Sequence, residues 1–204
     1  MDNATCTLEL LPSLSPGCVL ALTTMAELEA AASTVRNVGY NDSASSFVFS
    51  GSSYALIPRP VQDDFTIVLE IRSSTPCTTG AGQTTWYDGC GVIDGEMPDI
   101  VLDFGLNLLD SRLAFAAKDT DSAVSTTSVT DGAWHTVVAT RVMSTRELTL
   151  PIAGVLEGSY TGSTAAQSLT APSELKIGDA VDATGGFFTG ELRNIRFFDQ
   201  AIGP

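Results

Sequence analysis

The chain has 204 residues, of which 44% are hydrophobic and 17% are charged, so it can bury the core of one large domain. Ten basic and 24 acidic side chains give a formal net charge of −14, which repels phosphate backbones and disfavours nucleic acid. Neutral glycans, cations or basic proteins fit this charge better, although solubility alone also explains it. Since no apolar run approaches the roughly 18 residues of a transmembrane helix, we expect no membrane insertion.

The N-terminal segment, residues 1–44, differs in pattern from the rest of the chain. It lacks the basic and apolar regions of a secretory signal, so we expect export by another route, such as release with a virus particle, or loss of the signal. Thr24 and Glu27 have capping-box spacing before an alanine-rich run, which predicts a short helix over 24–32. We therefore separate an appendage, 1–44, from a domain, 45–204.

From residue 47 onward the hydrophobic pattern has a period of two, which is typical of half-buried strands. The clearest run alternates four apolar side chains with other residues: Phe65, Ile67, Leu69 and Ile71. Further strands are predicted at 100–109, 112–118, 134–143, 147–152, 174–177 and 191–198. Turn pairs such as Asp131-Gly132 predict antiparallel neighbours, and residues 159–168 are predicted to form a polar loop.

The four cysteines fall into two close pairs, Cys6 with Cys18 and Cys77 with Cys90. We predict these two disulfides, although four cysteines allow three connectivities and the sequence alone does not choose among them. Disulfides suit an extracellular, cell-surface or virion-surface location. A zinc site is not expected, because the cysteine spacings are wrong and the one histidine, His135, lies in a predicted strand.

Four segments follow one another in a characteristic order: 45–58 (SSFVFSGSSYALIP), 64–72 (DFTIVLEIR), 131–141 (DGAWHTVVATR) and 190–202 (GELRNIRFFDQAI). They resemble laminin G-like, concanavalin-type lectin and glucanase domains. The resemblance implies an all-β jelly-roll sandwich of two antiparallel sheets that binds a ligand rather than catalysing a reaction. The segment 148–158 departs from the family pattern. Because Pro151 cannot donate to a ladder, its strand is predicted to be bulged or at a sheet edge.

The segment 77–96 has the most ligand-like composition. A glycine-rich loop closed by a disulfide would present Trp86 and Tyr87 to the C–H faces of a sugar, with Asp88 accepting bonds from its hydroxyls. Asp94 and Glu96 extend this predicted ligand site. The alternative is that the two aromatic residues only pack over the end of the sandwich.

The acidic turn after residue 118 is the candidate calcium site. In calcium-binding relatives an aspartate of this loop is a ligand, and Asp119 or Asp121 matches that position. Ser168 and Thr170 lie where the resemblance places further oxygen ligands. Calcium takes six to eight oxygens, so these positions make up only part of a site, and a solvated turn explains them equally.

Catalysis is the least favoured interpretation. Glycosidases of this fold use paired carboxylates on one strand, and Asp94 with Glu96 only superficially permits that arrangement, since Gly95, Met97 and Pro98 interrupt the strand. His135 has no recognisable nucleophile and Trp134 is predicted to be a core residue.

We therefore expect a non-enzymatic recognition or adhesion module that binds a glycan or a surface protein through its rim loops, with calcium as a candidate cofactor. The main alternative is a structural decoration or fibre-associated protein on a virus particle, docked on a capsid or other scaffold through residues 1–44. A glycoside hydrolase or lyase ranks third.

Overall fold

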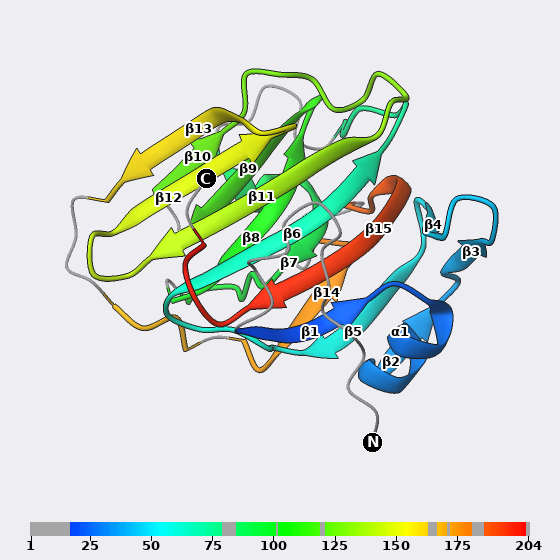
Figure 1. Cartoon of the computed structure of the whole chain (residues 1–204), viewed down its shortest axis with the longest axis horizontal. Coiled ribbons are helices and arrows are strands. Elements are labelled where there is room, and N and C mark those ends of the chain that lie inside the picture. Colours follow the sequence, from blue (N-terminus) through cyan, green and yellow to red (C-terminus); the bar gives the residue numbers. More distant parts are fainter. Residues whose placement is uncertain are drawn as a thin grey trace.

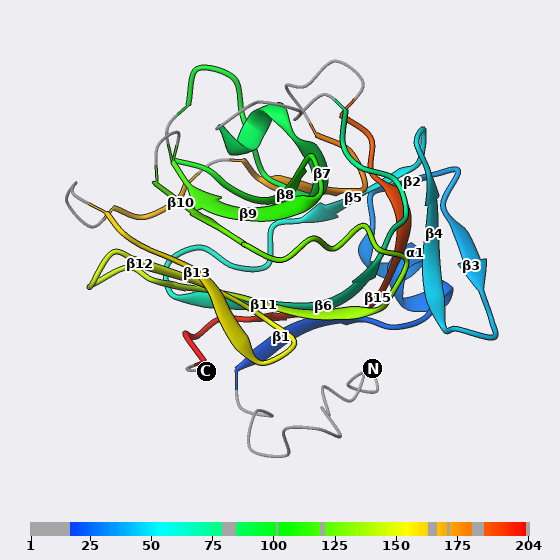
Figure 2. The ribbon, with the colours of Figure 1, turned by 90° about the horizontal axis from the view of Figure 1, so that it is seen from above.

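The computed structural model describes residues 17–78, 85–100, 102–118, 121–162, 167–170, 172–180 and 186–202. Two stacked sheets form a sandwich, and every described strand pair is antiparallel, as expected from the sequence (Figures 1 and 2). The first sheet has the order β13-β12-β11-β6-β15-β4-β3, and β1 also pairs with β15. The second has the order β10-β9-β8-β7-β14-β5-β2.

The eight-stranded sheet contains β1 (Cys18–Leu22), β3 (Gly39–Asn41), β4 (Ser46–Ser50), β6 (Phe65–Arg72), β11 (His135–Val142), β12 (Glu147–Ile152), β13 (Val155–Thr161) and β15 (Thr189–Phe198). The seven-stranded sheet contains β2 (Thr34–Arg36), β5 (Tyr54–Pro58), β7 (Cys90–Asp94), β8 (Phe104–Leu109), β9 (Arg112–Ala117), β10 (Asp121–Val124) and β14 (Glu174–Ile177). Two short helices are described, α1 (Met25–Ala31) and the 3-10 helix η1 (Trp86–Asp88).

The main core lies between the sheets and follows the predicted alternation. Phe65 and its apolar partners on β6 are fully buried, and the Phe65 ring packs 4.7 Å from that of Phe104 on β8. Each such side chain contributes roughly 1.5–3 kcal/mol through burial. Because strands alternate their faces, the residues between these point to the outer side of the sheet, where Thr66 accepts from Ile202 N and Val68 packs against Phe198 and Ile202.

The described part of the N-terminal segment is built into the sandwich. β1 pairs with β15, β2 with β5 and β3 with β4, so the described residues 17–44 extend both sheets. The predicted capping box of α1 is present, with Glu27 N donating to Thr24 Oγ1 at 3.2 Å and Thr24 N donating to the Glu27 carboxylate at 3.0 Å. No helix in the described ranges is long and apolar enough to cross a bilayer.

Strands β1, β2, β3, β7, β10 and β13 lie outside the strand ranges predicted from the sequence. β7 ends at Asp94, within the predicted ligand loop, and β13 covers the start of the segment predicted as a polar loop. The register of β12 and β13 shifts between Leu150 and Pro151, which confirms the predicted bulge. Ala153 and Gly154 join these two strands with left-handed φ values of 51° and 79°, as in a type I′ hairpin turn.

The disulfide between Cys77 and Cys90 is present, which confirms one predicted pair. Cys18 is also disulfide-bonded, and its predicted partner, Cys6, lies outside the described residues. The Cys77–Cys90 bond ties the segment that carries η1 to the start of β7.

Candidate functional site

The outer face of the seven-stranded sheet is covered by η1. Figure 2 shows the η1 coil lying within the curve of β7, β8 and β9. Trp86 is fully buried there against Leu109, Ala114 and Ala116, and its indole N–H donates to the Lys118 carbonyl at 2.9 Å. Neither ring face of Trp86 reaches solvent in this conformation, which matches the alternative that Trp86 packs over the sandwich, and its stacking on a sugar stays a prediction.

The neighbours of Trp86 explain why the segment folds down. A Cβ on Gly105 would lie 2.3 Å from Trp86 Cζ3, so only glycine leaves room for the indole at this position of β8. Asn107 donates to the Trp86 carbonyl at 3.2 Å, which satisfies a buried backbone group. Tyr87 and Asp88 are half-buried at the margin of this cover, so they remain candidate ligand contacts.

Asp94 and Glu96 are also buried, at 1% and 5% exposure. Asp94 accepts from Glu96 N at 2.6 Å and from the Asn107 amide at 3.0 Å, and burial raises its pKa to about 6. Asp94 ends β7 and Glu96 follows it, so neither carboxylate is presented to solvent in this structure, and their part in ligand binding stays a prediction. To hydrolyse a glycosidic bond, two carboxylates must be accessible to the substrate. Asp94 and Glu96 are not accessible in this structure.

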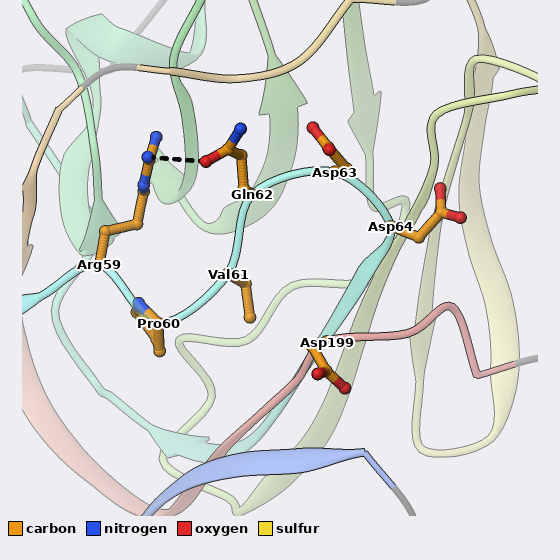
Figure 3. A pocket seen from close by; sticks show the side chains of 7 residues that line it. All are labelled: Arg59, Pro60, Val61, Gln62, Asp63, Asp64 and Asp199. Carbon is orange, nitrogen blue, oxygen red and sulfur yellow. Dashed lines mark hydrogen bonds between the residues drawn. The ribbon is translucent and has the colours of Figure 1, made fainter.

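An open hollow of about 440 Å³ lies at one rim of the sandwich (Figure 3). It is formed by the segment between β5 and β6 and by the residue after β15: Arg59, Pro60, Val61, Gln62, Asp63, Asp64 and Asp199. We call these seven residues the rim hollow. Its volume falls within the 300–1,000 Å³ of typical ligand sites, and it combines an apolar floor with carboxylate, amide and guanidinium groups.

A chain of hydrogen bonds ties the rim hollow to residues 167–170. Arg59 donates to the Leu169 carbonyl at 2.5 Å and to the Gln62 side chain at 3.2 Å, the bond drawn in Figure 3. Gln62 donates to Ser168 Oγ at 2.5 Å, and Ser168 Oγ donates to the Asp63 carboxylate at 2.6 Å. These bonds fix several polar groups at the hollow before any ligand arrives.

Of the four predicted calcium ligands, Asp121, Ser168 and Thr170 lie within the described residues, and calcium binding by them stays a prediction. The Ser168 hydroxyl is hydrogen-bonded to the side chains of Asp63 and Gln62. Thr170 is exposed, and Asp121 at the start of β10 is 8% exposed. The Tyr160 hydroxyl bonds to Asp121, and the pKa of Tyr160 is raised by burial and then by the Asp121 charge. Asp119 lies outside the described residues. Within the described ranges, no three His, Cys, Asp or Glu side chains form a metal site.

The outer face of the eight-stranded sheet carries Trp134, which was predicted to be in the core. It is half-buried, and the guanidinium groups of Arg72 and Arg193 lie 4.7 and 4.2 Å from its ring centre. Arg72 pairs with Glu191 at 2.5 Å and Arg193 with Glu70 at 2.6 Å. A second hollow of about 410 Å³, which includes Arg72 and Glu191, lies beside this network.

His135 is a strand residue, as predicted, and it hydrogen-bonds to Asp131 at 2.8 Å. The sequence analysis missed the rim hollow entirely. Its only sequence signal was the polar run between two strands, RPVQDD, at residues 59–64.

Residues 49–204 match the family model described as the Concanavalin A-like lectin/glucanases superfamily. The chain belongs to this superfamily. A search of curated proteins found no match. Domain 4 of an extracellular arabinanase from Geobacillus stearothermophilus, in complex with arabinotriose, is similar at a TM-score of 0.57 and 15% identity, covering 84% of this chain and 78% of that one.

Two further solved structures have a similar fold. The Ruminococcus gnavus IT-sialidase CBM40 bound to alpha2,3 sialyllactose has a TM-score of 0.58 at 10% identity, covering 92% of this chain and 95% of that one. A botulinum neurotoxin type C structure, described by its interaction with two ganglioside molecules, has a TM-score of 0.65 at 13% identity, covering 92% of this chain and 49% of that one. At these identities the likeness shows the fold alone.

Proposed function

We propose that this protein is a secreted, non-enzymatic carbohydrate-binding domain whose rim hollow binds a neutral oligosaccharide. The observation that carries the proposal is the contrast in access: η1 covers the outer face of β7–β9, whereas the rim hollow is open and lined by hydrogen-bonding groups. The disulfide between Cys77 and Cys90 supports secretion. Similar folds bound to arabinotriose and to sialyllactose support carbohydrate as the ligand class.

The chemistry of the rim hollow fits sugar hydroxyls. Carboxylates accept hydrogen bonds from hydroxyls, and the Gln62 amide both donates and accepts. Pro60 and Val61 offer apolar surface to the C–H groups of a sugar ring. The hollow thus has the mixed apolar and polar lining that small-molecule sites use for affinity and orientation.

The charge of the rim hollow favours neutral over anionic sugars. Three carboxylates line it, those of Asp63, Asp64 and Asp199, and the one guanidinium, Arg59, already donates to two acceptors. A sialylated glycan would bring a further negative charge to this site on a chain of net charge −14. We therefore expect arabinotriose-like neutral ligands to bind more tightly than sialyllactose.

A glycan-array screen followed by calorimetric titration tests the proposal. Neutral oligosaccharides should bind, and Asp199→Asn should weaken the binding at least about tenfold, because a charged hydrogen-bond acceptor is lost. Ser74→Ala, in the second hollow, is the matched control and should bind as the wild type does. Loss of binding in Ser74→Ala alone would instead place the ligand in the second hollow, and no binding to any glycan would overturn the proposal.

A further inference from the structure

Arg141 ends the segment DGAWHTVVATR and lies where the rim is built. It belongs to β11 and pairs in register with Phe65 of β6 and Leu148 of β12. The residue is only 5% exposed. A guanidinium is held at this depth only when carbonyl or carboxylate oxygens surround it, because burying a charge without partners is costly.

The Arg141 guanidinium joins the 59–64 segment of the rim hollow to the neighbouring segment 167–170. Nη1 donates to the Asp63 carbonyl at 2.5 Å and, more weakly, to the Gln62 carbonyl at 3.4 Å. Nη2 donates to the Gln167 carbonyl at 2.7 Å. Backbone carbonyls converging from separate segments are also the oxygens that Ca²⁺ takes in proteins, together with carboxylates.

Three carboxylates also act electrostatically on this guanidinium. Burial lowers the pKa of Arg141, while the nearby charges of Asp63, Asp64 and Asp121 raise it. Arginine nevertheless stays protonated in proteins, so a permanent positive charge stands among these three carboxylates. Asp121 is one of the residues that the sequence analysis assigned to calcium, and its carboxylate already interacts electrostatically with this fixed cation.

We propose that Arg141 takes at this rim the place of a bound metal ion, so that the rim hollow keeps its shape and binds its ligand without a divalent cation. A second cation beside the guanidinium would meet electrostatic repulsion and would have to compete for carbonyls already bonded. Arg141 is thus a positioning residue. The inference deepens the proposed function and rests on it for the identity of the ligand.

The experiment compares calcium with EDTA in the wild type and two variants. Neither the melting temperature nor the glycan affinity of the wild type should differ between the two conditions. Arg141→Met leaves three carbonyls and nearby carboxylates without their cation, so the melting temperature should fall by roughly 10 °C. Arg141→Lys keeps the positive charge but lacks the planar guanidinium with its several N–H donors, so its melting temperature should fall less than that of Arg141→Met.

Amide hydrogen exchange separates this role from general destabilisation. Exchange in Arg141→Met should rise first at residues 59–64 and 167–170, while the amides of β8 and β9 keep their protection. Arg141→Lys should restore part of the protection at both segments. Equal loss of protection across the whole sandwich would contradict a role confined to the rim.

A calcium-induced rise in the melting temperature of the wild type that Asp121→Asn abolishes would overturn the inference. Glycan binding that EDTA removes would also overturn it and leave the proposed function standing. If no glycan binds in either condition, the proposed function fails, and the calcium titration with the exchange pattern still decides the inference about Arg141.

Discussion

The outer face of β7–β9 and the rim hollow are two surfaces of one sandwich that differ in access: the first is covered and the second is open. On the first surface, Gly105, Ala114 and Ala116 leave space that the Trp86 side chain fills. The Cys77–Cys90 disulfide holds the segment that carries η1 in place. On the second, hydrogen bonds between distant segments hold polar side chains around a space that no side chain fills. The difference shows that the segments covering a surface of this domain, more than the strands beneath them, decide whether a ligand can reach that surface.

The comparison predicts that Trp86→Ala has the largest effect. Removing a buried indole and its hydrogen bond should lower the free energy of unfolding by about 3–5 kcal/mol, measured by urea denaturation. Trp134→Ala, a half-buried control, should cost less because one side of its environment is solvent. Titration of folded Trp86→Ala with glycan should give wild-type affinity. A selective loss of affinity would show that the covered face opens to bind.

The second prediction concerns Asp94 beneath the cover. Its pKa is raised from 3.8 to about 6, so the folded state binds a proton more tightly than the unfolded chain does. Stability contributed by this group is therefore present at low pH and is lost as the pH rises from about 4 to 6, by about 3 kcal/mol. Unfolding experiments across that range should show this loss in the wild type and not in Asp94→Asn. Identical pH profiles would contradict the assigned burial effect.

The third prediction is the opposite of that for Trp86→Ala: a small effect on stability and a clear effect on glycan affinity. Asp64→Asn in the rim hollow should lower the free energy of unfolding by about 1 kcal/mol or less, because the exposed side chain loses its charge near Arg141 while its remaining oxygen can still accept from Met143 N. Its glycan affinity should nevertheless fall several-fold, since a charged acceptor becomes an amide. Asp42→Asn, exposed on another part of the surface, is the control. Equal affinities in both variants would remove Asp64 from the site.

The smallest effect is expected at Glu157 on β13. Its pKa is lowered by hydrogen bonds from the Thr126 and Thr127 side chains, followed by those from their backbone N–H groups. The stability from this group is present above the ordinary pKa and is lost as the pH falls, opposite in sign to Asp94. Glu157→Gln should lower the melting temperature slightly at neutral pH, and the difference should vanish in acid. A difference that persists in acid would point to lost packing instead.

The sequence predicted the elements that depend on neighbouring residues. The alternation from Phe65 to Ile71 predicted a strand, Thr24 and Glu27 predicted a capped helix, and Pro151 predicted the bulge. In each case the cause lies within a few residues, where periodicity and hydrogen-bonding chemistry can be seen directly.

The site depends on residues that are far apart in the chain. Asp63 and Ser168 are 105 positions apart, and the burial of Trp86 depends on Gly105 and on alanines of β9. Loop composition alone therefore favoured Trp86 as a ligand residue, while the polar run at 59–64 passed unnoticed. The docking role of residues 1–44 and a part for Asp119 in calcium binding stay predictions, because residues 1–16 and Asp119 lie outside the described residues.

The turn of the β12–β13 hairpin is a suitable site for attaching the protein to a surface. Ala153 N donates to the Thr136 carbonyl, five residues before Arg141 on β11, so its turn lies about 17 Å along the strand from the rim. Nothing lies within 4 Å of the Cβ position of Gly154. A biotin-acceptor peptide inserted between Ala153 and Gly154 would attach the protein to a sensor chip by one defined point, with the rim hollow facing the flowing analyte.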